Sequence, residues 1–284
     1  MNKVLIVAII GILTISFIGC DIKSKEKSVG NKEENITQTD DNVKSAQAND
    51  ESENLNGNKL IDEKVALDDA TDINIEICAA EVSIKSYDGE DVKITGKLSE
   101  KSKGIDINKN GNKIEIIEKD YKVRGFIMDS ENNSSKFNIL VPLKLKGDFE
   151  FKQGAGTTDI EGIKVKNINI SGGATKLKCE DIRFDKLNLN LGAAKVGLNL
   201  NEKCGDIVIN GGVGEVNIKM AEVGGNLTYK GGVGIGNITI PENSPVRFVT
   251  QNGVGKCEVK AKTSGKDTYT FDLKVGAGSI SVRN

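Results

Sequence analysis

Residues 206–240 read DIVINGGVGEVNIKMAEVGGNLTYKGGVGIGNITI and carry the clearest pattern in the chain. It holds two Gly-Gly-Val-Gly segments, at 211–214 and 231–234, each between short runs in which apolar and polar residues alternate. Alternation with a period of two is typical of a β-strand that buries one face. Glycine suits a corner between two strands, because it has no Cβ to clash where backbones approach closely. The stretch therefore predicts units of strand, corner, strand and loop.

The same unit recurs through the second half of the chain. Small-residue triplets follow one another at intervals of about 18 to 24 residues, with short alternating strands around them. Such a period is typical of stacked supersecondary units, each of which buries its apolar face against the next. We therefore expect an all-β fold, a solenoid-like stack of short strands similar to a parallel β-helix. The triplets are Gly154-Ala155-Gly156, Gly172-Gly173-Ala174, Gly192-Ala193-Ala194, Gly211-Gly212-Val213, Gly231-Gly232-Val233, Asn252-Gly253-Val254 and Gly276-Ala277-Gly278.

The composition divides the chain into three parts. Residues 1–19 are mostly apolar, residues 20–70 are polar, and residues 71–284 carry the strand patterns. Within the last part, residues 151–284 hold the regular repeats and residues 71–150 hold less regular strands. The earlier strands either form a separate small sheet or are the first rungs of the stack, and we favour first rungs.

Two short motifs lie in these earlier strands. Cys78-Ala79-Ala80 is followed by an alternating strand and looks like a diverged copy of the corner triplet. Asn110-Gly111 stands between two alternating runs, which is a strong hairpin signal.

The N-terminus has the order of a secretory signal. Lys3 precedes an apolar run over residues 4–18, and Gly19-Cys20 ends it. Phe17-Ile18-Gly19-Cys20 resembles the lipobox of bacterial lipoproteins, which implies that residues 1–19 are removed and that Cys20 receives a lipid. The alternative is an uncleaved anchor, although the run is shorter than the roughly 20 residues that span a membrane as a helix. Both alternatives place the rest of the chain outside the cytoplasm, attached to the membrane.

The polar segment after Cys20 has the composition of a disordered linker. Residues 21–60 contain no aromatic residue, few aliphatic residues and many Lys, Glu, Asp, Asn and Ser residues. Such a segment buries too little apolar surface to offset its ordering entropy. We expect it to hold the β domain away from the membrane.

Composition also excludes several classes of function. The formal net charge is −2, from 39 basic and 41 acidic residues, and 4% of residues are aromatic. A nucleic-acid partner is not expected, because no basic stripe follows a phosphate backbone. The chain has no histidine, which removes the commonest general base and the commonest metal ligand. We expect no catalytic residues, no cofactor and no metal site.

The other four cysteines, Cys78, Cys179, Cys204 and Cys257, are scattered and form no Cys-x-x-Cys pair. In an exported protein they could form two disulfides. Cys179 and Cys257 stand in phase with apolar neighbours, so we favour thiols that pack in the core.

The Gly-Gly-Val-Gly segments could also be phosphate-binding or calcium-binding loops. Glycine-rich loops bind phosphate where a helix follows them. Here strands follow and the motif repeats, which favours corners. Calcium-binding repeats carry an Asp in each copy, and these copies lack it.

The repeats resemble a known family. The glycine corners, the segment Ile139-Leu140-Val141-Pro142-Leu143 and the closing Gly276-Ala277-Gly278-Ser279-Ile280-Ser281-Val282 look like the adhesin-type domains of bacterial envelope proteins. They are also similar to the toast-rack domains of envelope stress proteins. The resemblance covers about residues 71–284. It implies a toast-rack-like β domain outside the cell, with no catalytic residues.

Two hypotheses of function follow. The first is a membrane-anchored, non-catalytic surface module, adhesin-like or a partner in envelope sensing, which contacts envelope proteins or cell-wall components. The second is a protein that binds or hydrolyses glycans through loop carboxylates, since paired carboxylates can act as acid and base. The candidate carboxylates are Asp88, Glu90 and Asp91 in one loop, and Asp129 and Glu131, beside Arg124 and Tyr121, in another.

Overall fold

The computed structural model describes residues 59–119 and 134–284. These residues form 13 strands of one sheet and contain no helix. The expected signal at residues 1–19, Cys20 and most of the linker lie outside them. The strands are β1 (Leu60–Ala66), β2 (Asp72–Tyr87), β3 (Asp91–Lys97), β4 (Gly104–Asn110), β5 (Lys113–Lys119), β6 (Ser135–Pro142), β7 (Asp148–Glu161), β8 (Asn167–Glu180), β9 (Lys186–Leu200), β10 (Asp206–Met220), β11 (Leu227–Thr239), β12 (Val246–Val259) and β13 (Tyr269–Arg283).

The described residues contain no membrane-spanning helix. The all-β prediction is confirmed. The sheet is mostly parallel and is not closed, because it ends in separate edge strands.

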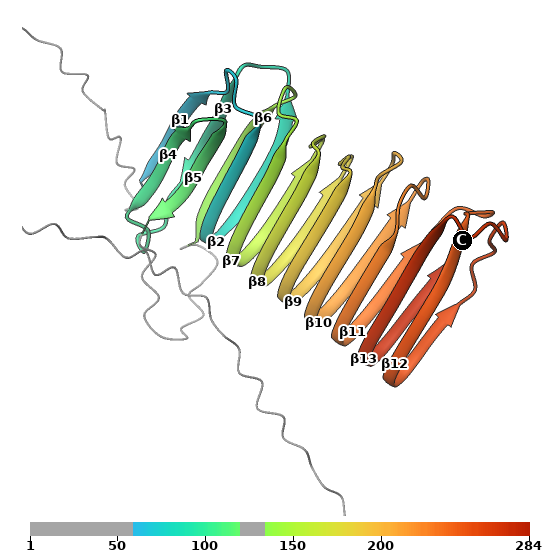
Figure 1. Ribbon diagram of the computed structural model, residues 1–284. Helices are drawn as coiled ribbons and strands as arrows, with labels where there is room; N and C mark the ends of the chain where they lie inside the picture. Colours follow the sequence, from blue (N-terminus) through green and yellow to red (C-terminus); the bar gives the residue numbers. More distant parts are fainter. Residues whose placement is uncertain (1–58, 120–133) are drawn as a thin grey trace, which may run out of the picture. The chain divides into compact units, whose positions relative to one another are not determined.

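Eight long strands, β2 and β7 to β13, are the rungs of a stack (Figure 1). Each rung bends near its middle, so that a first arm runs to the bend and a second arm runs back beside it. Neighbouring rungs pair in parallel along both arms. Each residue pairs with the residue at the same position of the next repeat. For example, Ile209 pairs with Tyr229 before the bend, and Ile218 pairs with Ile238 after it.

The repeat unit differs from the expectation in one respect. We expected two short strands joined by a corner, whereas each rung is one continuous strand that bends. The ladder between β10 and β11 includes Gly211 and Val213 and omits only Gly212 between them. Because a single residue leaves the pairing, hydrogen bonding continues through the bend and the two arms count as one strand.

The omitted residues form a row of glycines along the bends. A Cβ built on Gly212 would lie 2.5 Å from the carbonyl oxygen of Gly192, and one on Gly232 would lie 2.4 Å from that of Gly212. Real Cβ contacts are not this short, so each rung can lie on the previous one only if this position has no side chain. The same close approach recurs at Gly154, Gly173, Gly253 and Gly276.

The core lies between the two arms of each rung. Ile207 and Ile209 point inward from the first arm of β10, and Val216 and Ile218 point inward from its second arm. Loop residues such as Phe184, which is 2% exposed, close the core on the side away from the bends.

The first rung is flanked by shorter strands, which pair with it in parallel and with one another in antiparallel orientation. The first arm of β2 pairs with β5, which forms a hairpin with β4, and the second arm pairs with β6, which leads through β3 to β1. The hairpin turns at Gly111, where φ is +60°, between the paired residues Asn110 and Lys113. The Asn110-Gly111 prediction is therefore confirmed.

At the other end the order of strands in space departs from their order in the chain. The last strand, β13, lies between β11 and β12, so that β12 forms the edge. Asn284 follows β13 and fixes this crossing. Its side-chain nitrogen donates to the carbonyl oxygens of Ile240 and Pro241, both at 3.2 Å, and its side-chain oxygen accepts from the N–H of Lys262 at 2.6 Å.

Candidate interaction surface

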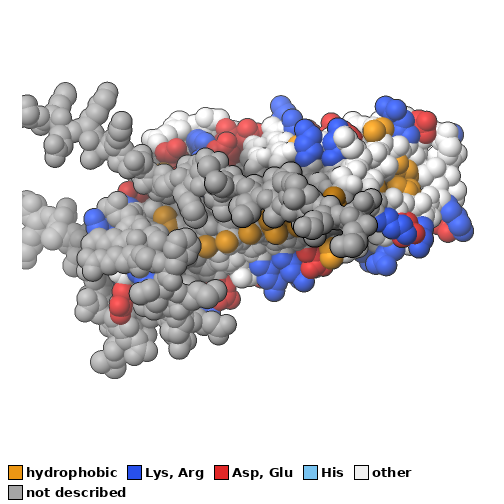
Figure 2. Space-filling view, turned by 90° about the horizontal axis from the view of Figure 1, so that it is seen from below, with side chains coloured by type: hydrophobic (Ala, Val, Ile, Leu, Met, Phe, Trp, Pro, Cys, Tyr) orange, Lys and Arg blue, Asp and Glu red, His pale blue; other side chains and the backbone are white. Residues whose placement is uncertain are grey.

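The bends carry a row of exposed aliphatic side chains, one residue after the glycine row. Val213, Val233 and Val254 are 51%, 54% and 78% exposed. Figure 2 looks at the bends from below and shows hydrophobic side chains in a line, with Lys and Arg side chains gathered beside it. The register places alanine or valine at this position in every regular rung. We call this row the bend ridge; it consists of Ala155, Ala174, Ala193, Val213, Val233, Ala277 and Val254.

The outward faces of the arms are polar and are held by contacts between rungs. The amide of Asn188 donates to Asn169 at 2.7 Å, and that of Asn237 donates to Asn217 at 2.9 Å. Asn210 donates in the same way to Asn190. Asparagine side chains of successive rungs are therefore joined in pairs. These amides stabilise the stack, since each pair joins successive rungs.

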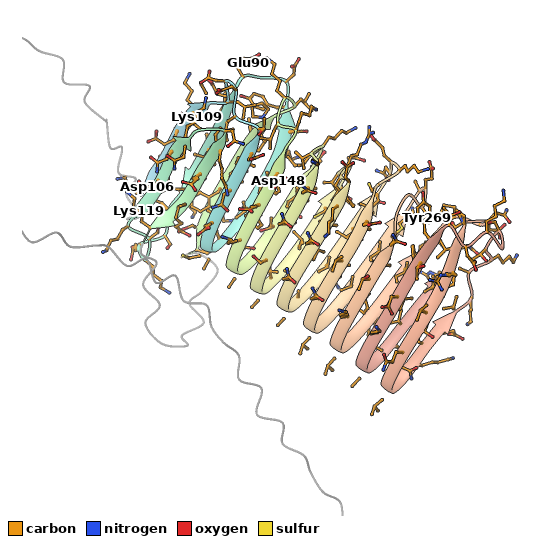
Figure 3. The ribbon with its side chains drawn as sticks, in the orientation of Figure 1. Glu90, Asp106, Lys109, Lys119, Asp148 and Tyr269 are labelled. Atoms are coloured by element: carbon orange, nitrogen blue, oxygen red, sulfur yellow. The ribbon has the colours of Figure 1, made fainter. Side chains whose placement is uncertain are left out.

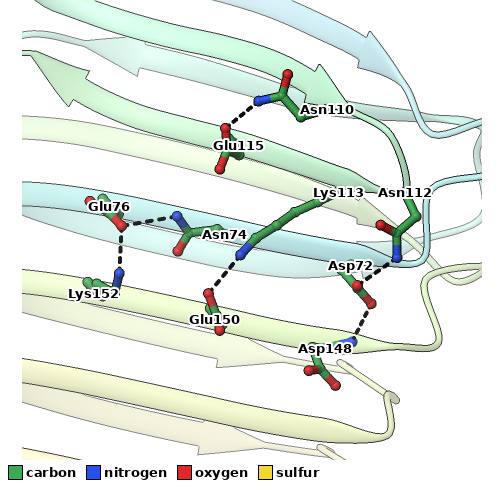
Figure 4. A network of polar contacts seen from close by, with 10 residues as sticks. All are labelled: Asp72, Asn74, Glu76, Asn110, Asn112, Lys113, Glu115, Asp148, Glu150 and Lys152. Atoms are coloured by element: carbon green, nitrogen blue, oxygen red, sulfur yellow. Dashed lines mark hydrogen bonds and ion pairs between the residues drawn. The ribbon is translucent and has the colours of Figure 1, made fainter. Parts of the chain in front are cut away.

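Charged side chains join the amides where the regular rungs meet the first strands (Figure 4). Lys113 of β5 bonds to Glu150 of β7 at 3.0 Å, across β2. Lys152 of β7 bonds to Glu76 of β2 at 2.7 Å. The N–H of Asp148 donates to the carboxylate of Asp72 at 2.9 Å. These charged groups serve the packing of strands and do not converge on a common point.

The carboxylates proposed for glycan chemistry do not form a site in the described residues. Lys144 binds Glu90 at 2.6 Å, and Lys64 approaches Asp91 at 3.5 Å, so both carboxylates have surface ion-pair partners. Figure 3 shows Glu90 at the edge away from the bends, far from Asp106 and Asp148. Glu90 lies in the loop before β3 and Asp91 is the first residue of that strand, and both are ordinary polar surface residues. The second cluster, Asp129 and Glu131 with Arg124 and Tyr121, lies outside the described residues.

No disulfide joins Cys78, Cys179, Cys204 and Cys257. Cys179 is fully buried in the second arm of β8, and burial raises the pKa of its thiol far above the ordinary range. Burial likewise raises the pKa of Cys204 to about 11. Thiols with such pKa values are poor nucleophiles near neutral pH, because little thiolate is present. Both are core residues, as the phase of Cys179 predicted, whereas Cys257 is only half-buried because it lies in the edge strand β12.

A buried carboxyl group closes the row of bends at the first rung. Cys78 stands where later rungs have the stacking glycine, and its N–H donates to Glu118 at 2.8 Å. Ser135 donates its hydroxyl to the same carboxyl group at 3.0 Å. Glu118 is 4% exposed, and burial raises its pKa, although these hydrogen bonds act in the opposite direction. Its side chain therefore acts as an N-terminal cap on the stack.

A second buried polar group lies one rung further on. The amide of Gln153 donates to the carbonyl oxygen of Ala80 at 2.9 Å and accepts from Thr158 at 2.8 Å and Thr175 at 3.0 Å. All of its partners come from adjoining bends, so it fixes the position of three rungs. Neither Glu118 nor Gln153 was predicted from the sequence. The only available signal was a polar residue in an inward-facing position of an alternating strand.

The described residues contain no group of three or more Asp, Glu, Cys or His side chains that could hold a metal ion. A shallow hollow lies on the outward face of the second arms, where Gly197 has no side chain and Lys219 and Arg283 stand nearby. Lys178 at its margin is bonded to Glu180 at 2.9 Å. The hollow has no convergent set of groups for a reaction.

Comparisons with known proteins agree with this fold. Residues 70–283 match the family model of the Toastrack DUF4097 domain. No curated protein is significantly similar to the chain.

Two solved structures illustrate the similarity. A "putative cell adhesion protein" from Clostridium sporogenes is 16% identical over 79% of this chain and 99% of its own, with a TM-score of 0.44. A "putative adhesin" from Bacteroides fragilis is 17% identical over 79% of this chain and 97% of its own, with a TM-score of 0.39. At this level of similarity they say nothing about the function of this chain. The family model, however, covers nearly the whole β domain, and the chain belongs to the Toastrack DUF4097 family.

Proposed function

We propose that this protein is a lipoprotein of the bacterial cell envelope, anchored outside the cytoplasm through a lipid on Cys20, and that its β domain is a non-catalytic interaction module. Its partners are envelope proteins or cell-wall components, in an adhesin-like role or in envelope sensing. The lipobox-like residues 17–20 support the anchor. The ion-paired surface carboxylates and core thiols support a domain without chemistry of its own.

The bend ridge is the observation that carries the proposed contact. It exposes aliphatic side chains in a regular line, whereas the polar side chains on the arms are largely engaged with neighbouring rungs. Exposed apolar rows are typical of interaction surfaces. A partner that lies along the bends would bury Val213 and Val233 without disturbing the ladder, because both side chains point away from the core.

The anchor is tested by labelling cells that express the full chain with radioactive palmitate. We expect label in the wild type and none in Cys20→Ala, which should also move from the membrane fraction to the soluble fraction. Cys257→Ala is the matched control and should keep both the label and the location. Label that persists in Cys20→Ala would refute lipidation at this residue.

The contact is tested by affinity capture from envelope extracts. Val213→Ser with Val233→Ser removes apolar surface from the ridge on β10 and β11. Val208→Ser with Thr228→Ser changes the outward face of the same two rungs and is the control. We expect the ridge variant to lose captured partners and the control to keep them. Equal capture by both variants would show that the ridge is not the contact.

A further inference from the structure

The edge strand β12 differs from the other rungs in its burial. It pairs with β13 on one side only, over 14 residues that contain no proline. Its inward positions are open at the end of the stack: Phe248 and Cys257 are half-buried, and Val259 is 37% exposed. The corresponding residues of β13, Phe271, Ile280 and Val282, are at most 1% exposed. The core therefore continues to the end of the stack and stops there uncovered.

The opposite end of the stack is protected. Its edge strand β1 has seven residues and carries Asp62, Glu63 and Lys64 in a row. Glu118 also covers the bend of the first rung, as described above. Short, charged edges of this kind are how proteins avoid pairing through sheet edges. By contrast, β12 is twice as long, and its three charged residues lie near its ends, with none from Phe248 to Gly255; they are Arg247, Lys256 and Glu258. Of the two ends, the edge at β12 is therefore the less protected.

We propose that two copies of this chain associate through β12, as antiparallel edges with bend placed on bend. In this register Phe248 lies opposite Val259 of the second copy, Thr250 lies opposite Cys257, and Gly253 lies opposite Val254. Antiparallel strands pair directly in this way across a two-fold axis. The axis passes through the bend, between the two arms.

The bent shape of the rung explains why a second copy fits. A two-fold rotation about the line between the arms places the first arm of one copy on the second arm of the other. Inward-facing residues are even-numbered before the bend, as Phe248 and Thr250 are, and odd-numbered after it, as Cys257 and Val259 are. The rotation pairs an even-numbered residue with an odd-numbered one, so inward-facing side chains of the two copies meet on both arms. The two cores become one, and the unpaired backbone groups of both edges pair.

The outward side chains are compatible with the same register. Val249 lies opposite Glu258 of the second copy, and Gln251 lies opposite Lys256. Arg247 is two residues before Val249 on the same outward face. Because Val249 lies opposite Glu258 of the second copy, Arg247 is a diagonal neighbour of Glu258. Diagonal neighbours are within reach of long side chains, and opposite charges there are favourable. Within the ladder from Phe248 to Val259, like charges do not face each other, and the one pair of like charges, Arg247 and Lys260, meets just beyond it.

A head-to-tail arrangement fits less well. The N-terminal end presents two separate short strands, β1 and β4, in place of one bent rung. If β12 of one copy paired with that end of the next, the assembly would always keep a free edge at each end. Further copies could then add without limit. The two-fold arrangement closes after two copies and uses the one end that is open.

The test uses the full chain, purified in detergent, with cysteines introduced on the outward face of β12. Val249→Cys with Glu258→Cys should give a disulfide-linked dimer on mild oxidation, since the two positions are on different arms and meet only between copies. Each single variant should give none. Val249→Cys with Gln251→Cys is the mismatch control, because both residues lie on the first arm. Failure of the first pair to cross-link, or equal cross-linking by the mismatch pair, would overturn the proposal.

A second measurement separates association from folding. Thr250 is exposed in a single copy, so Thr250→Lys should leave the fold intact and place two charges inside the paired cores. We expect detergent-corrected light scattering to give a dimer mass for the wild type and a monomer mass for Thr250→Lys, with unchanged circular dichroism. Thr228→Lys, on the outward face of β11, should remain a dimer. A monomeric wild type would overturn the proposal.

Discussion

Gly212→Ala tests whether close stacking at the bends holds the domain together. The added Cβ would lie 2.5 Å from the carbonyl oxygen of Gly192, whereas ordinary contact begins at 3.4 Å. The rungs β9 and β10 would have to separate by about 0.9 Å at this point, although hydrogen-bonded strands hold a spacing near 4.8 Å. The obstacle is a backbone carbonyl group, which cannot rotate out of the way as a side chain could.

Overpacking of this kind destabilises proteins by about 1 to 3 kcal/mol, and the rigid obstacle places Gly212→Ala near 2 kcal/mol. For a domain of this size the melting temperature should fall by roughly 4 to 8 °C. Gly211→Ala is the matched control in the same bend, because a Cβ at Gly211 would meet nothing within 4 Å. It should raise the free energy of unfolding by about 0.5 kcal/mol, through a stiffer unfolded chain.

Urea unfolding followed by far-ultraviolet circular dichroism measures both variants. The midpoint should fall for Gly212→Ala and stay level or rise for Gly211→Ala, with the slope against urea unchanged. Hydrogen exchange should show the loss of protection in β9 and β10 first. Equal stability of the two variants would refute the reasoning, since it would mean that the bends tolerate a side chain and that glycine is there for another reason.

Three further outcomes are expected. The pKa of Glu118 is raised in the folded state, which means that folding disfavours its ionised form. The free energy of unfolding should therefore decrease as the pH rises from the ordinary pKa of 4.5 towards the folded pKa. Glu118→Gln should flatten this slope when unfolding is measured between pH 4 and 8. Disulfide-exchange reagent at pH 8 should react with Cys204 far more slowly in the native protein than in urea, because burial raises the pKa of this thiol to about 11, and equal rates would contradict its buried position. Asn188→Ala should lower the free energy of unfolding by about 1 kcal/mol through loss of its bond to Asn169, and a larger effect would mean that the pair does more than join two rungs.

The architecture could be predicted from the sequence because its cause is local and repeated. Gly211-Gly212-Val213 and Gly231-Gly232-Val233 show that side-chain bulk is missing at a fixed interval, and stacking requires that absence at every rung. The phase of Cys179 among apolar neighbours likewise predicted its burial. Repetition made each signal visible several times in one chain.

Other features could not be predicted, because they are not repeated and depend on distant partners. Glu118 reads as one more charged residue in an alternating strand, and only the fold shows that it meets Cys78 and Ser135. Similarly, the periodic pattern carries no information on which rung is the edge. The bend ridge was also missed, because Val213 and Val233 follow glycines and were counted as part of the corners.

The crossing of β13 into the space between β11 and β12 has a consequence for synthesis. A chain that emerges from its N-terminus can add β7 to β11 one after another, each on a finished neighbour. When β12 emerges, its native neighbour does not yet exist, and about 24 more residues must follow before β13 is complete. At ordinary translation rates this wait is about 1 to 5 s. Until then β12 has no native partner, so a chain cut short before Tyr269 would lose two ladders at once, those of β13 with β11 and with β12.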